Sequence, residues 1–260
     1  MDGSAIAILA IGGIAVGISA GVLGIGGGVL MVPLLVTAGA TATEAVGTST
    51  LAILLTATSG SIQNLRTGVL DARKVLALGL PALLSAQLGA LMAERLPAYL
   101  LLGGFGLLLL VNIALMGLRQ NLAKLDMPPM RSQTDKEAIV PRLVTGGAAG
   151  LLAGLFGVGG GVIMVPLQML WLQEPIKHAI QTSLGVIVLT AISACFAHAR
   201  QDNVLWLAGL ALGTGGLIGA QLGTRFLPKL PDRSVRVIFR TVLVVLAFYT
   251  FWRAWQAYGT

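Results

Sequence analysis

The chain has 260 residues, of which 56% are hydrophobic and only 10% are charged, and its mean hydropathy is +0.89. Because a soluble domain has about 25% charged residues, this composition excludes a soluble globular protein and predicts a polytopic membrane protein. The 17 Lys and Arg residues outnumber the 10 Asp and Glu residues, but they lie in short connections between apolar segments. Basic residues in such connections orient a chain in a bilayer, so nucleic acid is not expected as a partner.

Eight hydrophobic segments follow one another along the chain, and each is long enough to cross a hydrocarbon layer, which takes about 20 apolar residues of helix. The last segment, 235–252, contains Arg236 and Arg240 near its beginning, where long side chains reach the interface. The other seven segments lie in charge-free runs at 3–43, 45–65, 75–93, 96–118, 143–173, 178–199 and 203–224. The sequence therefore predicts an all-α integral membrane protein.

Two of these runs are too long for a single crossing. The first, 3–43, would be about 60 Å long as one helix, against a hydrocarbon layer of ~30 Å. It contains GVLGIGGGVLMVPL at 21–34, whose consecutive glycines break a helix and whose proline adds a kink. The fifth run, 143–173, contains GLFGVGGGVIMVPL at 154–167, which is identical at 10 of 14 positions. Each run is predicted to form a broken or re-entrant helix hairpin that enters and leaves the membrane at one side.

Further matches in the same order indicate that the chain is duplicated. AVGTST at 45–50 resembles AIQTSL at 179–184, and AQLGA at 86–90 resembles AQLGT at 220–224, both at the same spacing. The predicted organisation is a first transmembrane repeat at 1–118, a polar cytoplasmic linker at 119–142 and a second transmembrane repeat at 143–260.

The distribution of basic residues indicates how the repeats are oriented, because Lys and Arg accumulate in short cytoplasmic loops. Eight single crossings would place 10 basic residues inside and 7 outside, which is barely a preference. If each repeat is a hairpin followed by three transmembrane helices, the two repeats have opposite orientations and the tally becomes 14 to 3, with only Arg95, Arg200 and Arg253 outside. The sequence therefore predicts two inverted-topology repeats in the cell (inner) membrane, with both termini non-cytoplasmic.

The glycine segments are the first candidate for a substrate site. A helix that begins inside a membrane has backbone N–H groups without intrahelical partners at the positive end of its dipole, which suits a small oxyanion. Such irregular backbone is buried in protein or lines a cavity. Close helix packing through small residues is the alternative explanation for these glycines. The candidate residues are Gly24, Gly26, Gly27 and Gly28 in the first repeat and Gly157, Gly159, Gly160 and Gly161 in the second.

Polar residues inside the following spans extend the candidate site. The opening turns of the second span contain Thr48 and Ser49 in the first repeat and Thr182 and Ser183 in the second. Their hydroxyls either donate to an anion or cap and back-bond to the helix. Gln87 and Gln221 occupy matching places in the third span, where an amide needs a partner, either a substrate oxygen or a neighbouring helix.

Several other kinds of site are not expected. No Asp or Glu lies deep inside a predicted span, which argues against a chain of carboxylates for protons or sodium. No Ser/His/Asp set, HExxH motif or metal-ligand group lies within a span, so the sequence predicts no enzyme, no catalytic residue, no metal and no cofactor. His198 is expected to be a hydrogen-bonding residue, with proton coupling as the alternative.

The paired glycine segments, GTST at 47–50 with QTSL at 181–184, and Arg-x-Gly at 66–68 resemble the sulfite exporter TauE/SafE family of membrane proteins. The resemblance covers nearly the whole chain. It implies transport of small sulfur-containing anions such as sulfite, sulfoacetate or related organosulfonates, usually outward. The second repeat departs from the pattern at Gln181, which replaces the glycine of the first repeat, and at Arg200-Gln201-Asp202, where a glycine would be expected.

An exporter that works by alternating access, with one repeat rocking against the other, is the preferred interpretation. A passive anion channel or uptake facilitator of the same architecture is the alternative. The expected partners are a small oxyanion substrate and membrane lipid, and homo-oligomerisation is left open.

Overall fold

The computed structural model describes residues 3–124 and 139–258, which form ten α-helices and one short 3₁₀-helix and contain no strand. The predicted all-α fold is therefore confirmed. The middle of the predicted linker, residues 125–138, lies outside the described residues. The helices are α1 (Gly3–Leu23), α2 (Gly28–Thr37), α3 (Ala42–Arg66), α4 (Ala72–Arg95), α5 (Ala98–Lys124), α6 (Ile139–Phe156), α7 (Gly161–Trp171), α8 (Ile176–Ala199), α9 (Trp206–Phe226), η1 (Leu227–Lys229) and α10 (Asp232–Tyr258).

Eight helical stretches of the described chain are long and apolar enough to cross a membrane, whereas α2 and α7 have only 10 and 11 residues. These two short helices follow α1 and α6 after breaks at 24–27 and 157–160. The two long apolar runs are thus interrupted at the glycine segments, as their length and composition predicted.

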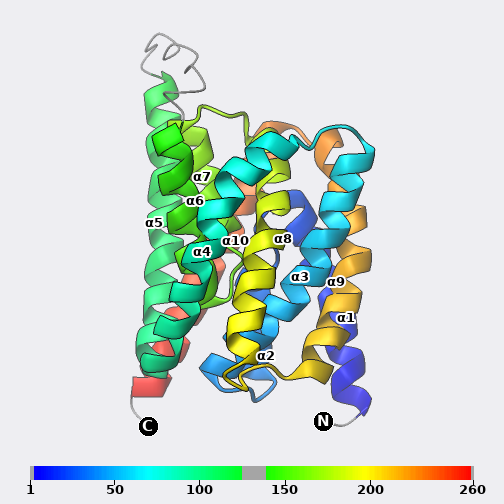
Figure 1. Cartoon of the computed structure of the whole chain (residues 1–260), viewed down its shortest axis with the longest axis vertical. Helices are drawn as coiled ribbons and strands as arrows, with labels where there is room; N and C mark the ends of the chain where they lie inside the picture. Colours follow the sequence, from blue (N-terminus) through cyan, green and yellow to red (C-terminus); the bar gives the residue numbers. More distant parts are fainter. Residues whose placement is uncertain (1–2, 125–138, 259–260) are drawn as a thin grey trace.

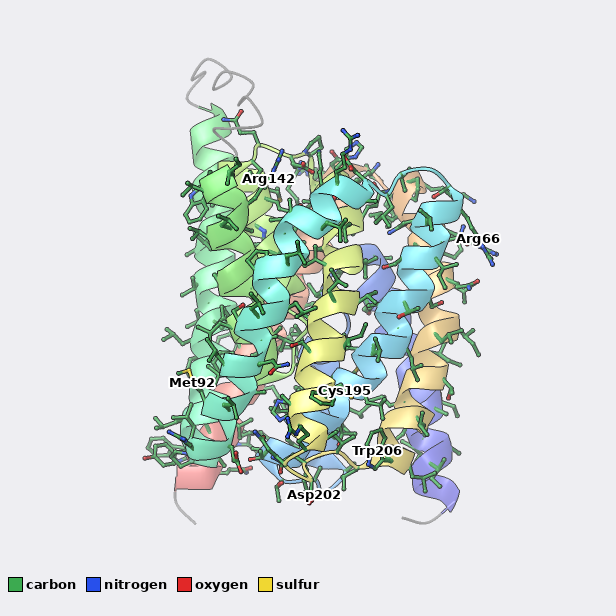
Figure 2. The ribbon with its side chains drawn as sticks, in the orientation of Figure 1. Arg66, Met92, Arg142, Cys195, Asp202 and Trp206 are labelled. Carbon is green, nitrogen blue, oxygen red and sulfur yellow. The ribbon has the colours of Figure 1, made fainter. Side chains whose placement is uncertain are left out.

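The two hairpins approach the centre of the molecule from opposite ends (Figure 1). We call the end where α1 begins and α10 ends the terminal end, and the opposite end, where α5 ends and α6 begins, the linker end. The α1–α2 hairpin opens toward the terminal end and the α6–α7 hairpin toward the linker end. Arg66 and Arg142 lie near the linker end, and Asp202 and Trp206 lie near the terminal end (Figure 2).

The hairpin of each half packs against a helix of the other half. α1 lies along α9, α6 lies along α4, and α5 lies along α10, while α3 and α8 contact each other. Small residues make the first two contacts close: a Cβ at Gly17 of α1 would lie 2.8 Å from the Cα of Gly216 on α9. Glycine at this position lets the two backbones touch.

Burial differs systematically between the helices. α3 and α8 are largely buried, whereas α4 and α10 bury only about a third of their most apolar stretch. Large exposed side chains such as Leu84 on α4 and Phe248 on α10 therefore form an outer apolar surface suited to lipid. The most buried part of the molecule surrounds the two helix breaks.

Candidate functional site

The two helix breaks have the same left-handed backbone. We call residues 24–27 the first glycine loop and residues 157–160 the second glycine loop. The φ angles are 67°, 69° and 84° at Gly24, Gly26 and Gly27, and 64°, 74° and 77° at Gly157, Gly159 and Gly160. Side chains disfavour such angles, so three glycines per loop are required by the turn itself. Gly27 and Gly160 are the N-caps of α2 and α7.

The two glycine loops meet each other in the interior. A Cβ at Gly28 would lie 2.6 Å from the Cα of Val158, and a Cβ at Gly161 would lie 2.9 Å from the Cα of Ile25. The side chains of Ile53 on α3 and Ile187 on α8 pack against both loops. Two motifs that lie far apart in the sequence therefore form one centre.

One buried serine joins each glycine loop to the opposite half of the chain. The Ser49 hydroxyl on α3 lies 2.8 Å from the carbonyl of Gly157 and 2.7 Å from that of Val46 in its own helix. The Ser183 hydroxyl on α8 likewise lies 2.7 Å from the carbonyl of Gly24 and 2.9 Å from that of Ile180, so each serine also back-bonds to its helix as the sequence allowed. Both side chains are fully buried. Each serine thus contacts the glycine loop of the repeat to which it does not belong, which sequence spacing alone could not indicate.

Gly24 and Gly157 donate their backbone amides to the carbonyls of Ala20 and Ala153, at 2.8 and 2.9 Å, whereas the other loop amides are buried without a backbone acceptor. Among the described residues, the hydrogen bonds outside regular helices include none donated by the amides of 25–27 or 158–160. The amides of Gly28 and Gly161 begin helices, where the first N–H groups have no intrahelical partner. Nearly all buried amides are hydrogen-bonded in proteins, so these amides at two positive helix ends are donors left available by the fold.

The other candidate residues divide into two groups. Thr48 and Thr182 are buried, and the Thr48 hydroxyl accepts a hydrogen bond at 2.9 Å from the amide of Leu205, which precedes α9. Gln87 is exposed on α4 and Gln221 is only partly buried on α9. The structure therefore brings the glycines and the serines together and places the two glutamines on outer faces.

Three polar residues that join separate elements were not among the sequence candidates. Thr190 on α8 donates to the carbonyl of Gly159 at 3.2 Å. Ser59 on α3 donates to the carbonyl of Leu217 at 2.7 Å, and Ser193 on α8 donates to that of Leu83 at 2.6 Å. These two serines recur at the spacing of the repeats, as do their acceptors, so the repeat spacing was the signal that could have found them.

His198 lies near the terminal end of α8 and contacts α6 one turn before the second glycine loop. It is fully buried, and its Nε2 lies 3.0 Å from the carbonyl of Gly154 while its Nδ1 has no partner. This is the hydrogen-bonding arrangement expected from the sequence. No group of three His, Cys, Asp or Glu side chains that could hold a metal ion occurs in the part of the chain that the structure describes.

Membrane-length helices arranged around two broken helices, whose loops meet in the interior, define a polytopic α-helical membrane protein of the transporter class. Residues 9–250 match the model of the sulfite exporter TauE/SafE family, and the chain belongs to this family. The helix breaks, the paired serines and the loop contacts are thus the arrangement that this family member builds from its repeated motifs.

Relatives with similar sequences have names of the same class. The chain is 28% identical over 260 residues to the probable membrane transporter protein YunE of Bacillus subtilis, covering 92% of this chain and 94% of YunE. It is 29% identical over 249 residues to a probable membrane transporter protein of Xylella fastidiosa, covering 93% of each chain. It is 25% identical over 260 residues to the probable membrane transporter protein MJ0441 of Methanocaldococcus jannaschii, covering 93% and 94%. No solved structure matches the chain significantly.

Proposed function

We propose that this membrane transporter moves small sulfur-containing anions, sulfite or organosulfonates, out of the cell by alternating access, and that the two glycine loops form its substrate site. The observation on which the proposal rests is that the buried backbone amides of 25–27 and 158–160 have no backbone acceptor. An oxyanion has several acceptor oxygens and satisfies such amides at the positive ends of helices. A cation would be repelled there.

The side chains around the loops support an anionic substrate. The side chains given in contact with the loops are uncharged and include Ser49, Ile53, Ser183, Ile187 and Thr190. An anion at this place therefore meets hydroxyls and apolar walls and no carboxylate. In such a dry site, the amide donors act more strongly on a charge than they do in water, while the hydroxyls hold the loop carbonyls.

The hairpin of each half packs against a helix of the other half, and this arrangement supports two repeats of opposite orientation. α1 lies along α9 as α6 lies along α4, and the hairpins open toward opposite ends. In the proposed mechanism one repeat rocks against the other around the shared loops, so that the site faces the two sides of the membrane in turn. The basic residues near the linker end make that end the cytoplasmic side in the proposal, with both termini outside the inner membrane.

The closed centre favours a carrier over a passive channel or uptake facilitator. The space lined by Thr50, Ile53, Gly159 and Thr190 has no room for a water molecule. A channel of this architecture would need a continuous wet path, whereas a carrier passes through states in which its centre is closed.

Flux measurements on the purified protein in proteoliposomes test the proposal. We expect saturable uptake of radiolabelled sulfite that unlabelled organosulfonates inhibit and that responds to an imposed proton gradient, with protein-free liposomes as the control. Sulfite flux that does not saturate and ignores the gradient would identify a channel. Flux of a cation without flux of any sulfur-containing anion would contradict the proposed site.

A further inference from the structure

The terminal end of the molecule contains an open pocket. This pocket has a volume of about 230 Å³ and lies between the α2–α3 connection and the beginning of α9. Its lining includes Leu9, Leu35, Gly39, Glu44, Leu205 and Ala208. Apart from Glu44, the lining consists of glycine and apolar side chains, which form no polar contact across the pocket.

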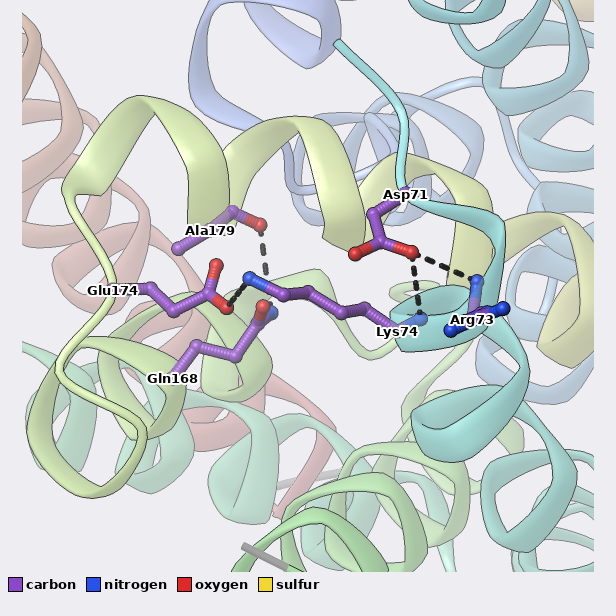
Figure 3. Close-up of polar contacts among 6 residues, drawn as sticks. All are labelled: Asp71, Arg73, Lys74, Gln168, Glu174 and Ala179. Carbon is purple, nitrogen blue, oxygen red and sulfur yellow. Dashed lines mark hydrogen bonds and ion pairs between the residues drawn. The ribbon is translucent and has the colours of Figure 1, made fainter. Parts of the chain in front are cut away.

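The repeats identify the corresponding residues at the linker end. The match of the glycine segments, extended by one position, aligns Leu35 with Gln168, and the spacing of the two AQLG motifs aligns Ala208 with Lys74. Figure 3 shows Lys74 of α4 extending to Glu174 in the α7–α8 connection, with Gln168 of α7 beside them. We call Lys74, Gln168 and Glu174 the polar cluster. The linker end therefore has polar side chains at the positions whose counterparts line the pocket at the terminal end.

The polar cluster contains an ion pair and two buried acceptors without donors. The Lys74 ammonium forms an ion pair with Glu174 Oε1, and Gln168 Nε2 donates to the carbonyl of Ala179 at 3.4 Å. Gln168 is fully buried and Glu174 is 9% exposed, yet Gln168 Oε1 and Glu174 Oε2 have no hydrogen-bond partner. A buried acceptor without a donor destabilises the arrangement that contains it. The closed arrangement is thus one that a suitable ligand can displace.

An apolar layer lies between the polar cluster and the glycine loops. Val75, Leu78, Ala149, Met164 and Val186 belong to this layer. Ala149 reaches the second loop, since a Cβ at Gly160 would lie 3.3 Å from the Ala149 Cβ. The polar cluster therefore lies on the route from the linker end to the proposed substrate site.

We propose that Lys74 is an anion-binding residue at the linker-end entrance, and that Glu174 holds this entrance closed by occupying Lys74. An arriving small oxyanion takes the place of the Glu174 carboxylate on the ammonium, because both present charged oxygens to the same donors. The released carboxylate then becomes hydrated and the α7–α8 connection moves away from α4. This inference rests on the proposed anion transport.

Accessibility of a cysteine below the polar cluster tests the closure. In a Cys195→Ala background, Ala149→Cys places one thiol in the fully buried apolar layer. We expect Glu174→Gln to raise the rate of its labelling by N-ethylmaleimide in detergent by about tenfold, the factor that 1.4 kcal/mol represents. The charge-swapped pair Lys74→Glu with Glu174→Lys should restore slow labelling, which a merely structural role of either side chain would not produce.

The control variant removes a different ion pair at the same end. Lys177 lies 3.4 Å from Asp232 and joins α8 to α10 outside the polar cluster, so Lys177→Gln should leave labelling unchanged. Thermal unfolding of each variant verifies that the protein is folded at the labelling temperature. Unchanged labelling in Glu174→Gln, equal acceleration in Lys177→Gln, or fast labelling in the charge-swapped pair would each overturn the closure.

The anion step has its own test. We expect methanesulfonate, replacing chloride at constant ionic strength, to accelerate labelling severalfold when Lys74 is present and to have no effect in Lys74→Gln. Methanesulfonate is used because sulfite itself reacts with maleimides. No acceleration, or equal acceleration without Lys74, would overturn the anion-binding role. The outcome is independent of the flux assay, so absence of sulfite transport would contradict the proposed function without changing the labelling result.

Discussion

Ser49 and Ser183 are the residues on which the contact between the two halves most directly depends. Each hydroxyl donates to a buried carbonyl of the opposite glycine loop, and loss of such a donor costs about 1–3 kcal/mol. We expect Ser49→Ala combined with Ser183→Ala to lower both the unfolding temperature and sulfite flux, and each single substitution to have a smaller effect. Thermal unfolding in detergent and proteoliposome flux measure the two quantities.

Ser85 provides the control for this prediction. Its hydroxyl donates to the carbonyl of Ala82 within the same helix, so Ser85→Ala removes a serine without touching a loop. Wild-type unfolding and flux in the double variant, or an equal loss in Ser85→Ala, would show that the hydroxyls do not hold the loops.

Gly27 separates backbone strain from the function of the loop. Its φ angle is 84°, and an alanine in the left-handed region costs roughly 1–2 kcal/mol. Gly39 has a φ angle of 97°, but a Cβ there would meet nothing within 4 Å. A Cβ at Gly27 would also lie 3.0 Å from side-chain atoms of Val16 and Met31. We expect both variants to lose stability from strain, Gly27→Ala the more, and only Gly27→Ala to lose sulfite flux. Equal flux in the two variants would remove the first loop from the substrate site.

At the residue scale, the candidates that the structure brings together are those that recur within matching sequence segments of both halves. The glycines and the two serines recur at fixed spacing in both halves, and the structure brings them together. Gln87 also recurs, as Gln221, but its helix has apolar residues on every side, so the sequence could not indicate which way the amide points. Tertiary packing turns it outward beside Leu84 and Leu91. The serine acceptors were likewise unpredictable because they belong to the other half.

At the scale of the helices, α1 and α9 depend on glycine for their close contact. A Cβ at Gly17 would lie 2.8 Å from the Cα of Gly216, so the backbones must separate to admit it. Overpacking of this kind costs about 1–3 kcal/mol. We expect Gly17→Ala to lower the unfolding temperature by several degrees and to reduce the yield of folded protein in detergent.

Gly12 is the matched position on the same helix. A Cβ there would meet only a side-chain atom of Leu34, at 3.1 Å, and that side chain can move. Gly12→Ala should therefore unfold within a degree or two of the wild type, since alanine also favours the helix. If both variants unfold at the same temperature, backbone contact is not what limits the substitution of glycine in α1.

The helix breaks were predictable, whereas the helix partners were not. An apolar run as long as 3–43 cannot cross a membrane once, and consecutive glycines mark where it must break. The observed ends of α1 and α6, Leu23 and Phe156, lie within the glycine segments where the breaks were expected. The pairing of α1 with α9 and of α6 with α4 depends on the shape of small-residue surfaces that many helices of this composition share.

At the scale of the whole molecule, the two halves are alike in packing but unlike at their outer ends. The loops, serines and helix partners have counterparts in both halves, so a movement of one half has an equivalent movement in the other. Ala208 and Lys74 are counterparts that differ in charge and size, so the terminal end has a pocket where the linker end has an ion pair. In the proposed mechanism this difference gives the two ends distinct roles.

The orientation of the halves leads to a prediction about the intact membrane. In a Cys195→Ala background, single cysteines replace Thr67 and Lys229 near the linker end, or Ala38 and Asp202 near the terminal end; all four positions are exposed. We expect an impermeant thiol reagent to label the first two only from the cytoplasmic side, because basic residues accumulate there, and the last two only from outside. Labelling of Thr67→Cys and Lys229→Cys from different sides would mean that the halves have the same orientation, and a rocking mechanism between inverted repeats would be excluded.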